Sequence, residues 1–327
     1  MQVSIHSVRP DQPLPQVIEP VPPAGDSVAD LCNWIGDHRE DLFARLTTHG
    51  GVLFRHFQVQ GPDDFGRVAA AVTAELRPYI EGQSPRTKIA KDVYTSTEYP
   101  SRFRITLHNE LSYALHPPTL ILFGCEVPPE SGGETPLVDC RKVYQGMDPD
   151  VRQRFVDRGV LYVKHMHGDA SGMGKSWMDH FETTDRARVE DYLRENKVSY
   201  EWIDGNGLRT EAIRPAVRQH PRTGEWLWFN QANLWHVGNL DASHRAQLVR
   251  TFGEDRLPTH AYFGDRTPIS EEELDHVQRT LWDSAVIFPW ERGDVLVLDN
   301  FLVAHGRMPF AGPRRILVAM GAAAPPR

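Results

Sequence analysis

The sequence has few cysteines and no long apolar run. Its 327 residues include only three cysteines, far apart and in no CxxC spacing, so it indicates neither a disulfide framework nor a zinc ribbon. No stretch approaches the roughly 18 consecutive apolar residues of a membrane span, and the first 25 residues lack the basic and apolar regions of a secretory signal. We therefore expect a cytoplasmic protein with reduced thiols and no contact with a membrane.

The chain also lacks an excess of basic residues. Lys and Arg number 36 against 44 Asp and Glu, which gives a formal net charge of −8. This balance argues against a general attraction to nucleic acid. The expected partner is therefore a small molecule or a group carried by another protein.

Apolar periodicity predicts short strands scattered among helices. Helices are expected at 28–46, 63–76, 148–160, 184–197 and 243–252, and strands at 51–56, 102–110, 119–126, 225–230, 294–299 and 315–320. Because the pattern shows no regular βαβ alternation and no glycine-rich nucleotide fingerprint, it favours an antiparallel β core decorated by helices. We expect one domain over residues 1–327.

Two segments of this domain differ in composition from the rest. A proline-rich lead-in occupies about residues 1–25, and a stretch rich in His, Gly and Ser lies within about 165–180. Glycines permit movement of the second stretch. It is a candidate for a mobile lid, and the alternative is a solvated loop.

The sequence contains more His-x-Asp/Glu pairs than chance predicts. Oxygen chemistry at non-haem iron uses two imidazoles and one carboxylate on one face of the metal, and such a pair supplies two of these ligands. Fifteen histidines and 44 acidic residues predict roughly two pairs by chance. Four are present, namely His38/Glu40, His108/Glu110, His167/Asp169 and His180/Glu182.

The expected local structure separates the four pairs. Residues i and i+2 diverge on a helix, so His38 and Glu40 cannot share a metal, whereas on a strand they point the same way, as expected for His108 and Glu110. An exposed polar strand face is the ordinary alternative for the second pair. The third pair lies in an expected loop and is the second candidate, and the fourth is interpreted as surface.

His305 is the candidate for the third ligand. It follows the apolar segment 294–299, and Arg315 opens a further expected strand ten residues after it. A buried arginine beside the metal would suit the distal carboxylate of 2-oxoglutarate, because its guanidinium can form two parallel hydrogen bonds with that group. Arg314 is then expected to point outward.

Four ordered segments carry a family resemblance. The sequences HNELSY at 108–113, GGETP at 132–136 and WFNQ at 228–231 precede the segment 299–316, which contains DN, His305 and RRI. Together they resemble the TauD/TfdA family of iron(II)- and 2-oxoglutarate-dependent oxygenases, and more closely its SyrP-like branch. The resemblance covers the chain from about residue 50 and implies an α+β fold with a double-stranded β-helix (jelly-roll) core and flanking helices.

The resemblance also implies the cofactors and their ligands. Fe(II) would be bound by His108, Glu110 and His305, and the co-substrates would be 2-oxoglutarate and O₂. Thr135 would donate to the carboxylate of 2-oxoglutarate, and Arg315 would pair with it. Glu110 stands where many members have aspartate, as it does in members that hydroxylate amino acids. A carboxylate at this position favours hydroxylation over chlorination.

The resemblance further implies the class of substrate. This is an amino acid or aminoacyl group, free or tethered to a carrier protein, in specialised metabolism of the non-ribosomal peptide type, such as antibiotic biosynthesis. The candidates for substrate contact are Asn109, Ser112, Tyr113, Trp228 and Asn230. The ordinary alternatives are that the aromatic residues belong to the core and that the amides cap turns.

Other functions fit parts of this pattern. A desaturase or epoxidase would use the same cofactors, and a non-catalytic cupin-like binding module would keep the fold. A zinc hydrolase could use the same His/Glu/His ligands. Thr135 and Arg315 argue against the hydrolase, because a hydrolase does not need contacts to 2-oxoglutarate.

Overall fold

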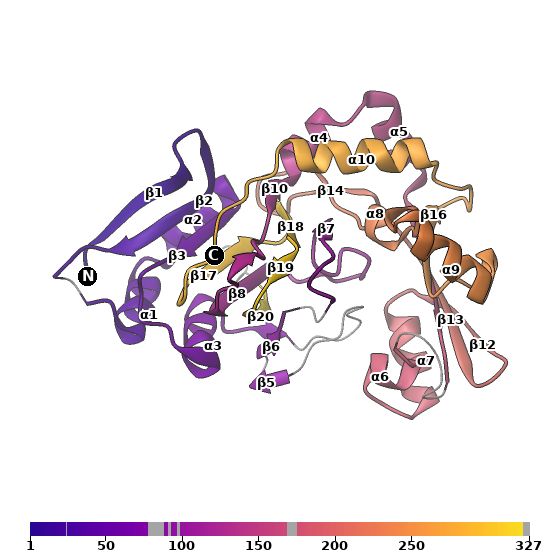
Figure 1. Cartoon of the computed structure of the whole chain (residues 1–327), viewed down its shortest axis with the longest axis horizontal. Helices are drawn as coiled ribbons and strands as arrows, with labels where there is room; N and C mark the ends of the chain where they lie inside the picture. The colour runs from indigo at the N-terminus through magenta and orange to yellow at the C-terminus, as the bar shows by residue number, and fades with distance from the viewer. Residues whose placement is uncertain (24, 78–87, 91–92, 97–98, 169–174, 323–327) are drawn as a thin grey trace.

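The computed structural model describes residues 1–23, 25–77, 88–90, 93–96, 99–168 and 175–322. Its core consists of two mainly antiparallel sheets that face each other, with helices outside them (Figure 1). The larger sheet has the strand order β1-β2-β3-β17-β8-β20-β6-β5, with β4 paired to β20, and the smaller has the order β10-β18-β7. This is the α+β jelly-roll architecture that the resemblance implied.

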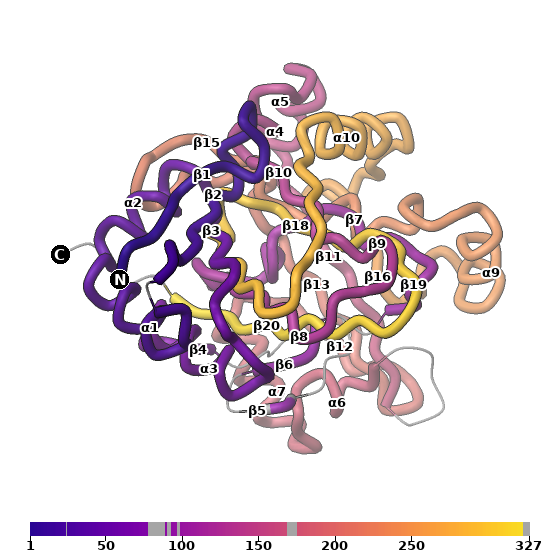
Figure 2. The backbone as a smooth tube through the Cα atoms, turned by 60° about the vertical axis from the view of Figure 1, so that its left-hand side comes forward, coloured from indigo at the N-terminus to yellow at the C-terminus, as the bar shows by residue number. Residues whose placement is uncertain are grey.

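The two sheets draw their strands from the whole chain. The larger sheet contains β1 (Val3–Arg9), β2 (Gln12–Pro20), β3 (Gly51–Phe54), β4 (Leu76–Arg77), β5 (Lys88–Ala90), β6 (Val93–Thr95), β8 (Leu120–Val127), β17 (Val295–Asp299) and β20 (Arg315–Gly321). The smaller contains β7 (Ile105–His108), β10 (Leu137–Asp139) and β18 (Val303–Arg307). The short strands β9 (Ser131–Gly132) and β19 (Phe310–Ala311) pair beside them. Figure 2 shows the C-terminal strand β20, in yellow, beside β8.

The central strands of the larger sheet are buried on both faces. In β17, Leu296 and Leu298 pack into the space between the sheets, whereas Val295 and Val297 pack against the helical layer. The residues of β20 alternate in the same way. A strand covered on both sides reads as a nearly continuous apolar run, which is why the sequence predicted these strands and could not assign their faces.

The helical layer is formed by α1 (Val28–Asp37), α2 (Arg39–His49) and α3 (Gly61–Val72). The expected single helix over 28–46 is wrong, because the chain turns at His38, where ψ is 26°. The His38 ring stacks on Trp34 at 4.6 Å. The turn lets both α1 and α2 bury apolar residues against the sheet. Ser27 caps α1 in a capping box with Asp30.

The N-terminal lead-in is part of the larger sheet. Strands β1 and β2 form a hairpin, and β2 pairs in parallel with β3. Proline-rich composition gave no signal of this pairing. Figure 1 shows the hairpin, in indigo, at the end of the molecule opposite to the insert described next.

A large insert separates β10 from β17. Its helices are α4 (Cys140–Gly146), α5 (Pro149–Arg158), α6 (Trp177–Phe181), α7 (Arg186–Glu195), α8 (Ala232–Trp235), α9 (Ala242–Phe252) and α10 (Glu271–Asp283). Its main sheet has the order β12-β13-β11-β16, with β11 (Val160–Met166), β12 (Ser199–Ile203), β13 (Gly207–Arg214) and β16 (Thr259–Phe263). The hairpin β14 (Val217–Gln219) and β15 (Trp226–Trp228) connects this sheet to the core. The helices expected at 148–160, 184–197 and 243–252 are confirmed as α5, α7 and α9.

The expected lid overlaps this insert. Residues 169–174 lie outside the described residues, and with them Asp169 of the third His-x-Asp/Glu pair. His165 belongs to β11, where it pairs with Arg209, and not to a loop as expected. His180 is buried, with its Nε2 3.4 Å from the Lys164 Nζ, so the surface interpretation of the fourth pair is wrong for the histidine. None of the described helices is both long and apolar enough to cross a bilayer.

Candidate metal centre

Strands β7 and β18 bring two histidines together. His108 and His305 are register partners across the two strands, and their ring centroids lie 4.6 Å apart. The Glu110 Oε2 lies 3.8 Å from the His305 Nε2. One ligand atom from each of the three residues can be chosen so that all lie within 4.8 Å of one another. Two imidazoles and one carboxylate in this arrangement suit a facial iron(II) site.

Glu110 is positioned by a turn and not by the expected strand. Strand β7 ends at His108, and Leu111 adopts a φ of 52°. The side-chain amide of Asn300 fixes this turn: its Oδ1 accepts from the Glu110 backbone N–H at 2.8 Å, and its Nδ2 donates to the Glu110 carbonyl at 2.9 Å. The same Nδ2 lies 2.8 Å from the Pro118 carbonyl. The carboxylate therefore depends on a fully buried amide 190 residues away in sequence.

The orientation of His108 is fixed by a second hydrogen bond. Its Nδ1 lies 2.9 Å from the Thr106 carbonyl oxygen. Because a carbonyl only accepts, Nδ1 carries the proton and the Nε2 lone pair is available to a metal. On the other histidine, the ring of Phe123 packs edge-on against His305 at 5.0 Å. The His108 ring is thus oriented by a hydrogen bond and the His305 ring by packing.

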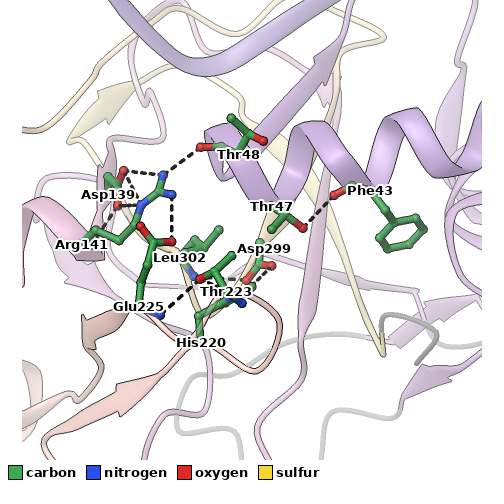
Figure 3. A network of polar contacts seen from close by, with 10 residues as sticks. All are labelled: Phe43, Thr47, Thr48, Asp139, Arg141, His220, Thr223, Glu225, Asp299 and Leu302. Atoms are coloured by element: carbon green, nitrogen blue, oxygen red, sulfur yellow. Dashed lines mark hydrogen bonds and ion pairs between the residues drawn. The ribbon is translucent and has the colours of Figure 1, made fainter. Parts of the chain in front are cut away.

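The turn that carries Asn300 is itself anchored. Asp299 accepts from the Leu302 N–H at 3.2 Å, and its other carboxylate oxygen lies 3.1 Å from the Nε2 of His220 (Figure 3). His220 is buried and directly follows β14, so this contact joins the β14–β15 hairpin to the end of β17. The segment that presents both Asn300 and His305 is fixed from the insert side.

A cavity opens beside the two imidazoles, between the two sheets. The residues that line it are Ser96, Ile105, His108, Phe123, Thr135, His305, Gly306, Arg307, Arg314 and Ile316. Thr135, a predicted contact of 2-oxoglutarate, lines this cavity, and its Oγ1 accepts from the Trp290 indole at 3.1 Å. The hydroxyl hydrogen therefore remains available to donate into the cavity.

Arg314, and not Arg315, lines this cavity. Arg315 is exposed and pairs with Glu126, with its Nε 2.9 Å from the Oε2, so its expected inward position is wrong. Arg314 donates from Nε to the Gly133 carbonyl at 2.9 Å, and no carboxylate among the described residues pairs with it. Burial, and secondly the nearby Arg307, lower the pKa of Arg314 to about 10. A half-buried cation without a carboxylate partner favours an anionic ligand.

The alternation of side chains along β20 explains why Arg314 points inward and Arg315 points outward. Arg314 precedes Ile316, Val318 and Met320 on the face that points between the sheets, while Arg315 shares its face with Leu317, which packs toward the helical layer. Both faces are apolar. The sequence therefore gave no sign of which arginine points inward.

Two of the predicted substrate residues have structural roles. Trp228 is buried in the core, with its ring 5.0 Å from that of Phe155. Asn230 accepts from the Ala232 N–H at 3.0 Å and donates to the Ala216 carbonyl at 2.9 Å. Neither lines the cavity beside the histidines, so the ordinary alternatives of core packing and turn capping describe them better.

The other three predicted substrate residues lie on the turn after β7. Asn109 donates to the Asn300 carbonyl at 2.7 Å, and Ser112 is buried. The Tyr113 ring packs edge-on against Trp235 at 4.9 Å. None of the three lines the cavity beside the histidines. Tyr113 lines a separate cavity together with Tyr162 and Trp235.

Sequence reasoning missed several residues that build this site. Asn300 and Arg307 lie within the matching segment 299–316 but received no role. Trp290 and Ser96 lie outside every matching segment, and no local pattern marks them. Only tertiary contacts identify these four residues.

Comparisons with known proteins agree with this geometry. Residues 10–320 match the family model described as Taurine catabolism dioxygenase TauD, TfdA family. The dapdiamide synthesis protein DdaC of Enterobacter agglomerans is 37% identical over 297 residues, which are 91% of this chain and 89% of that protein. A clavaminate synthase-like protein of Arabidopsis thaliana is 31% identical over 320 residues, 94% of each chain.

Solved structures share the fold. PvcB of Pseudomonas aeruginosa, described as an Fe, alpha-ketoglutarate dependent oxygenase from an isonitrile synthetic pathway, superposes with a TM-score of 0.55 at 16% identity. The match covers 98% of this chain and 92% of PvcB. The fold expected from the sequence is therefore confirmed.

The first prediction concerns Asn300. We expect Asn300→Ala to weaken Fe(II) binding by roughly 10- to 100-fold, because an outer partner that orients a ligand has an effect of that size. Asn300→Asp keeps the acceptor for the Glu110 N–H but loses the donor to the Glu110 carbonyl. Its Fe(II) affinity should lie between those of wild type and Asn300→Ala. Fe(II) affinity is measured by anaerobic titration, with circular dichroism to confirm folding.

The control for this experiment is Asn239→Ala. Asn239 is exposed and accepts a hydrogen bond from Gln278 at 3.1 Å. This change should leave Fe(II) affinity unaltered. Wild-type affinity in a folded Asn300→Ala protein would show that the amide does not position the carboxylate.

Proposed function

We propose that this chain, which belongs to the TauD/TfdA family of dioxygenases, hydroxylates a carbon atom of an amino-acid-like substrate. As a member of this family it is an iron(II)- and 2-oxoglutarate-dependent dioxygenase. The observation that carries the proposal is the convergence of His108, Glu110 and His305 beside a cavity that Arg307 and Arg314 line.

The substrate class rests on the similarity to a biosynthetic protein. DdaC is named for dapdiamide synthesis, and it aligns with 91% of this chain. We propose that the substrate here is an amino acid or aminoacyl group in specialised metabolism, taken free or from a carrier protein. The carboxylate of Glu110 supports hydroxylation, since as a ligand it would leave no place for a halide.

Bound Fe(II), with 2-oxoglutarate and O₂, supplies the oxidising power for insertion of one oxygen atom into a C–H bond, with release of succinate and CO₂. The three protein ligands would occupy one face of the metal and leave the opposite face to the co-substrates. His108 is already in the required tautomer, because its Nδ1 proton is committed to the Thr106 carbonyl.

Arg314 and Thr135 would bind the distal carboxylate of 2-oxoglutarate. A guanidinium binds a carboxylate through two parallel charge-assisted hydrogen bonds, and the Thr135 hydroxyl can donate a third because Trp290 occupies its acceptor site. Ile105, Phe123 and Ile316 line the same cavity. These apolar side chains would surround the methylene groups and exclude water.

Arg307 adds a second positive charge to the cavity. Its guanidinium is held by the carbonyl groups of Tyr99, Pro100 and Phe103 at 2.7 to 2.8 Å. Burial lowers the pKa of Arg307. Two cations at one cavity match a ligand with two carboxylates, since each uncompensated buried charge is costly alone.

The two neighbouring arginines provide a matched pair of variants. We expect Arg314→Gln to raise the KM for 2-oxoglutarate by about 10- to 100-fold, because a hydrogen bond to a charged group contributes about 1.5 to 3 kcal/mol. Arg315→Gln should change it by less than about twofold, since an exposed ion pair contributes little. Initial rates of succinate formation against 2-oxoglutarate concentration give both values. A larger rise in KM for Arg315→Gln than for Arg314→Gln would contradict this assignment and would favour Arg315, the residue expected from the sequence, as the partner of 2-oxoglutarate.

Product analysis tests the reaction itself. The enzyme is supplied with Fe(II), 2-oxoglutarate, O₂ and a panel of amino acids and aminoacyl carrier proteins. We expect one panel member to gain one oxygen atom in stoichiometric amounts with succinate, as read by mass spectrometry, and His305→Ala to abolish both products. A coupled product that has instead lost two hydrogen atoms would identify a desaturase and overturn hydroxylation.

A further inference from the structure

A groove with a volume of about 820 Å³ lies on the insert, apart from the metal centre. Its floor includes Leu161 of β11 and Ile213 of β13, which are register partners. The adjacent residues Tyr162 and Ala212 line a separate cavity on the opposite face of this sheet. The groove shares no residue with the cavity beside the histidines, so the proposed reaction gives it no role.

The groove exposes apolar side chains that a monomeric protein usually buries. Ile213 is 56% exposed and Trp226 is 47% exposed, and these are the two most exposed large hydrophobic residues in the described part of the chain. The Trp226 ring stacks on Tyr144 at 6.3 Å, which holds the indole in place. A fixed tryptophan beside an exposed isoleucine is typical of a protein-binding surface.

Arg218 supplies an unused charge in the same groove. Its guanidinium makes no hydrogen bond or ion pair to any described residue, and its Nε is buried without a partner. The carbon centre of this guanidinium lies 5.3 Å from the Phe229 ring. Burial, and secondly the charge of Arg214, lower the pKa of Arg218. An anion bound in the groove would give the Arg218 Nε a hydrogen-bond partner and would offset the cost of its partly buried charge.

The whole groove carries an excess of positive charge. Its lining includes Lys197 and Arg266 besides the two arginines, and its one carboxylate is that of Glu211. Arg266 binds this carboxylate at 2.6 Å. The chain as a whole has a net charge of −8, so the sign of the charge in the groove is opposite to that of the whole protein. A positively charged groove on a negatively charged protein attracts an acidic partner to that one surface.

We propose that this groove binds an acidic, partly apolar segment of a partner protein. A carboxylate of the segment would bind Arg218, and an apolar side chain would lie between Ile213 and Trp226. The volume exceeds what a single carboxylate fills, because pockets of about 300–1,000 Å³ accommodate drug-sized ligands. This inference goes beyond the proposed function and does not depend on it.

The test uses a fluorescein-labelled peptide of alternating Glu and Leu, and a matched peptide with Lys in place of each Glu. Fluorescence anisotropy should show that the full chain binds the acidic peptide and not the basic one, with affinity that falls as salt rises. Arg218→Gln should weaken binding by about tenfold or more, as expected for loss of a charged hydrogen bond. Trp226→Ser should also weaken it.

The matched control is Arg250→Gln, which removes an exposed arginine of α9 outside the groove and should leave affinity unchanged. Thermal melts confirm that each variant is folded.

Equal binding by wild type and Arg218→Gln would overturn the proposal. Complete displacement of the peptide by an equal concentration of free glutamate would identify a small-anion site instead. A dimer that Arg218→Gln dissociates would identify a second copy as the occupant. Either result would also overturn it.

Discussion

The hydrogen bonds between the Asn300 amide and the Glu110 backbone are the constraint on which the metal centre depends. Strand β7 presents His108 and then ends, so pairing within the sheet does not place the carboxylate. Asn300 satisfies both backbone polar groups of Glu110 in a site with no solvent access. An unsatisfied buried amide costs about 1 to 3 kcal/mol, which makes this arrangement of the turn strongly preferred.

The same constraint links distant parts of the chain. The turn that carries Asn300 leads directly into β18 and His305, and Asp299 ties it to His220 in the insert. Both sheets and the insert therefore meet at one short turn. Movement of this turn would displace a carboxylate and an imidazole together, so the ligand set is preorganised as a unit.

Three arginines of this protein differ in their surroundings. Arg315 forms an exposed pair with Glu126, a contact that contributes about 0 to 1 kcal/mol. Arg314 lines the cavity beside the histidines, and burial lowers its pKa. Arg218 lies in an open groove next to exposed apolar side chains. Arg315 is therefore occupied by an ion pair at the surface, whereas Arg314 and Arg218 remain available to ligands of different size.

Sequence patterns, through the spacing of His108 and Glu110 and a family resemblance, pointed to the three side chains that the structure brings together as a candidate metal site. They also predicted the central strands, whose apolar runs follow from burial on both faces. The inward arginine was not predictable, because both faces of β20 are apolar and alternation could not choose between residues 314 and 315. Trp228 lay in a matching segment, but it is a core residue, since a motif preserves packing as well as chemistry.

The central claim is that these three side chains form one iron site that takes 2-oxoglutarate. Anaerobic absorption spectroscopy of the protein with Fe(II) and 2-oxoglutarate tests it most directly, on wild type and on His108→Ala. We predict a weak visible charge-transfer band in wild type that is absent from the variant. A folded, iron-loaded wild-type protein without this band would contradict the claim.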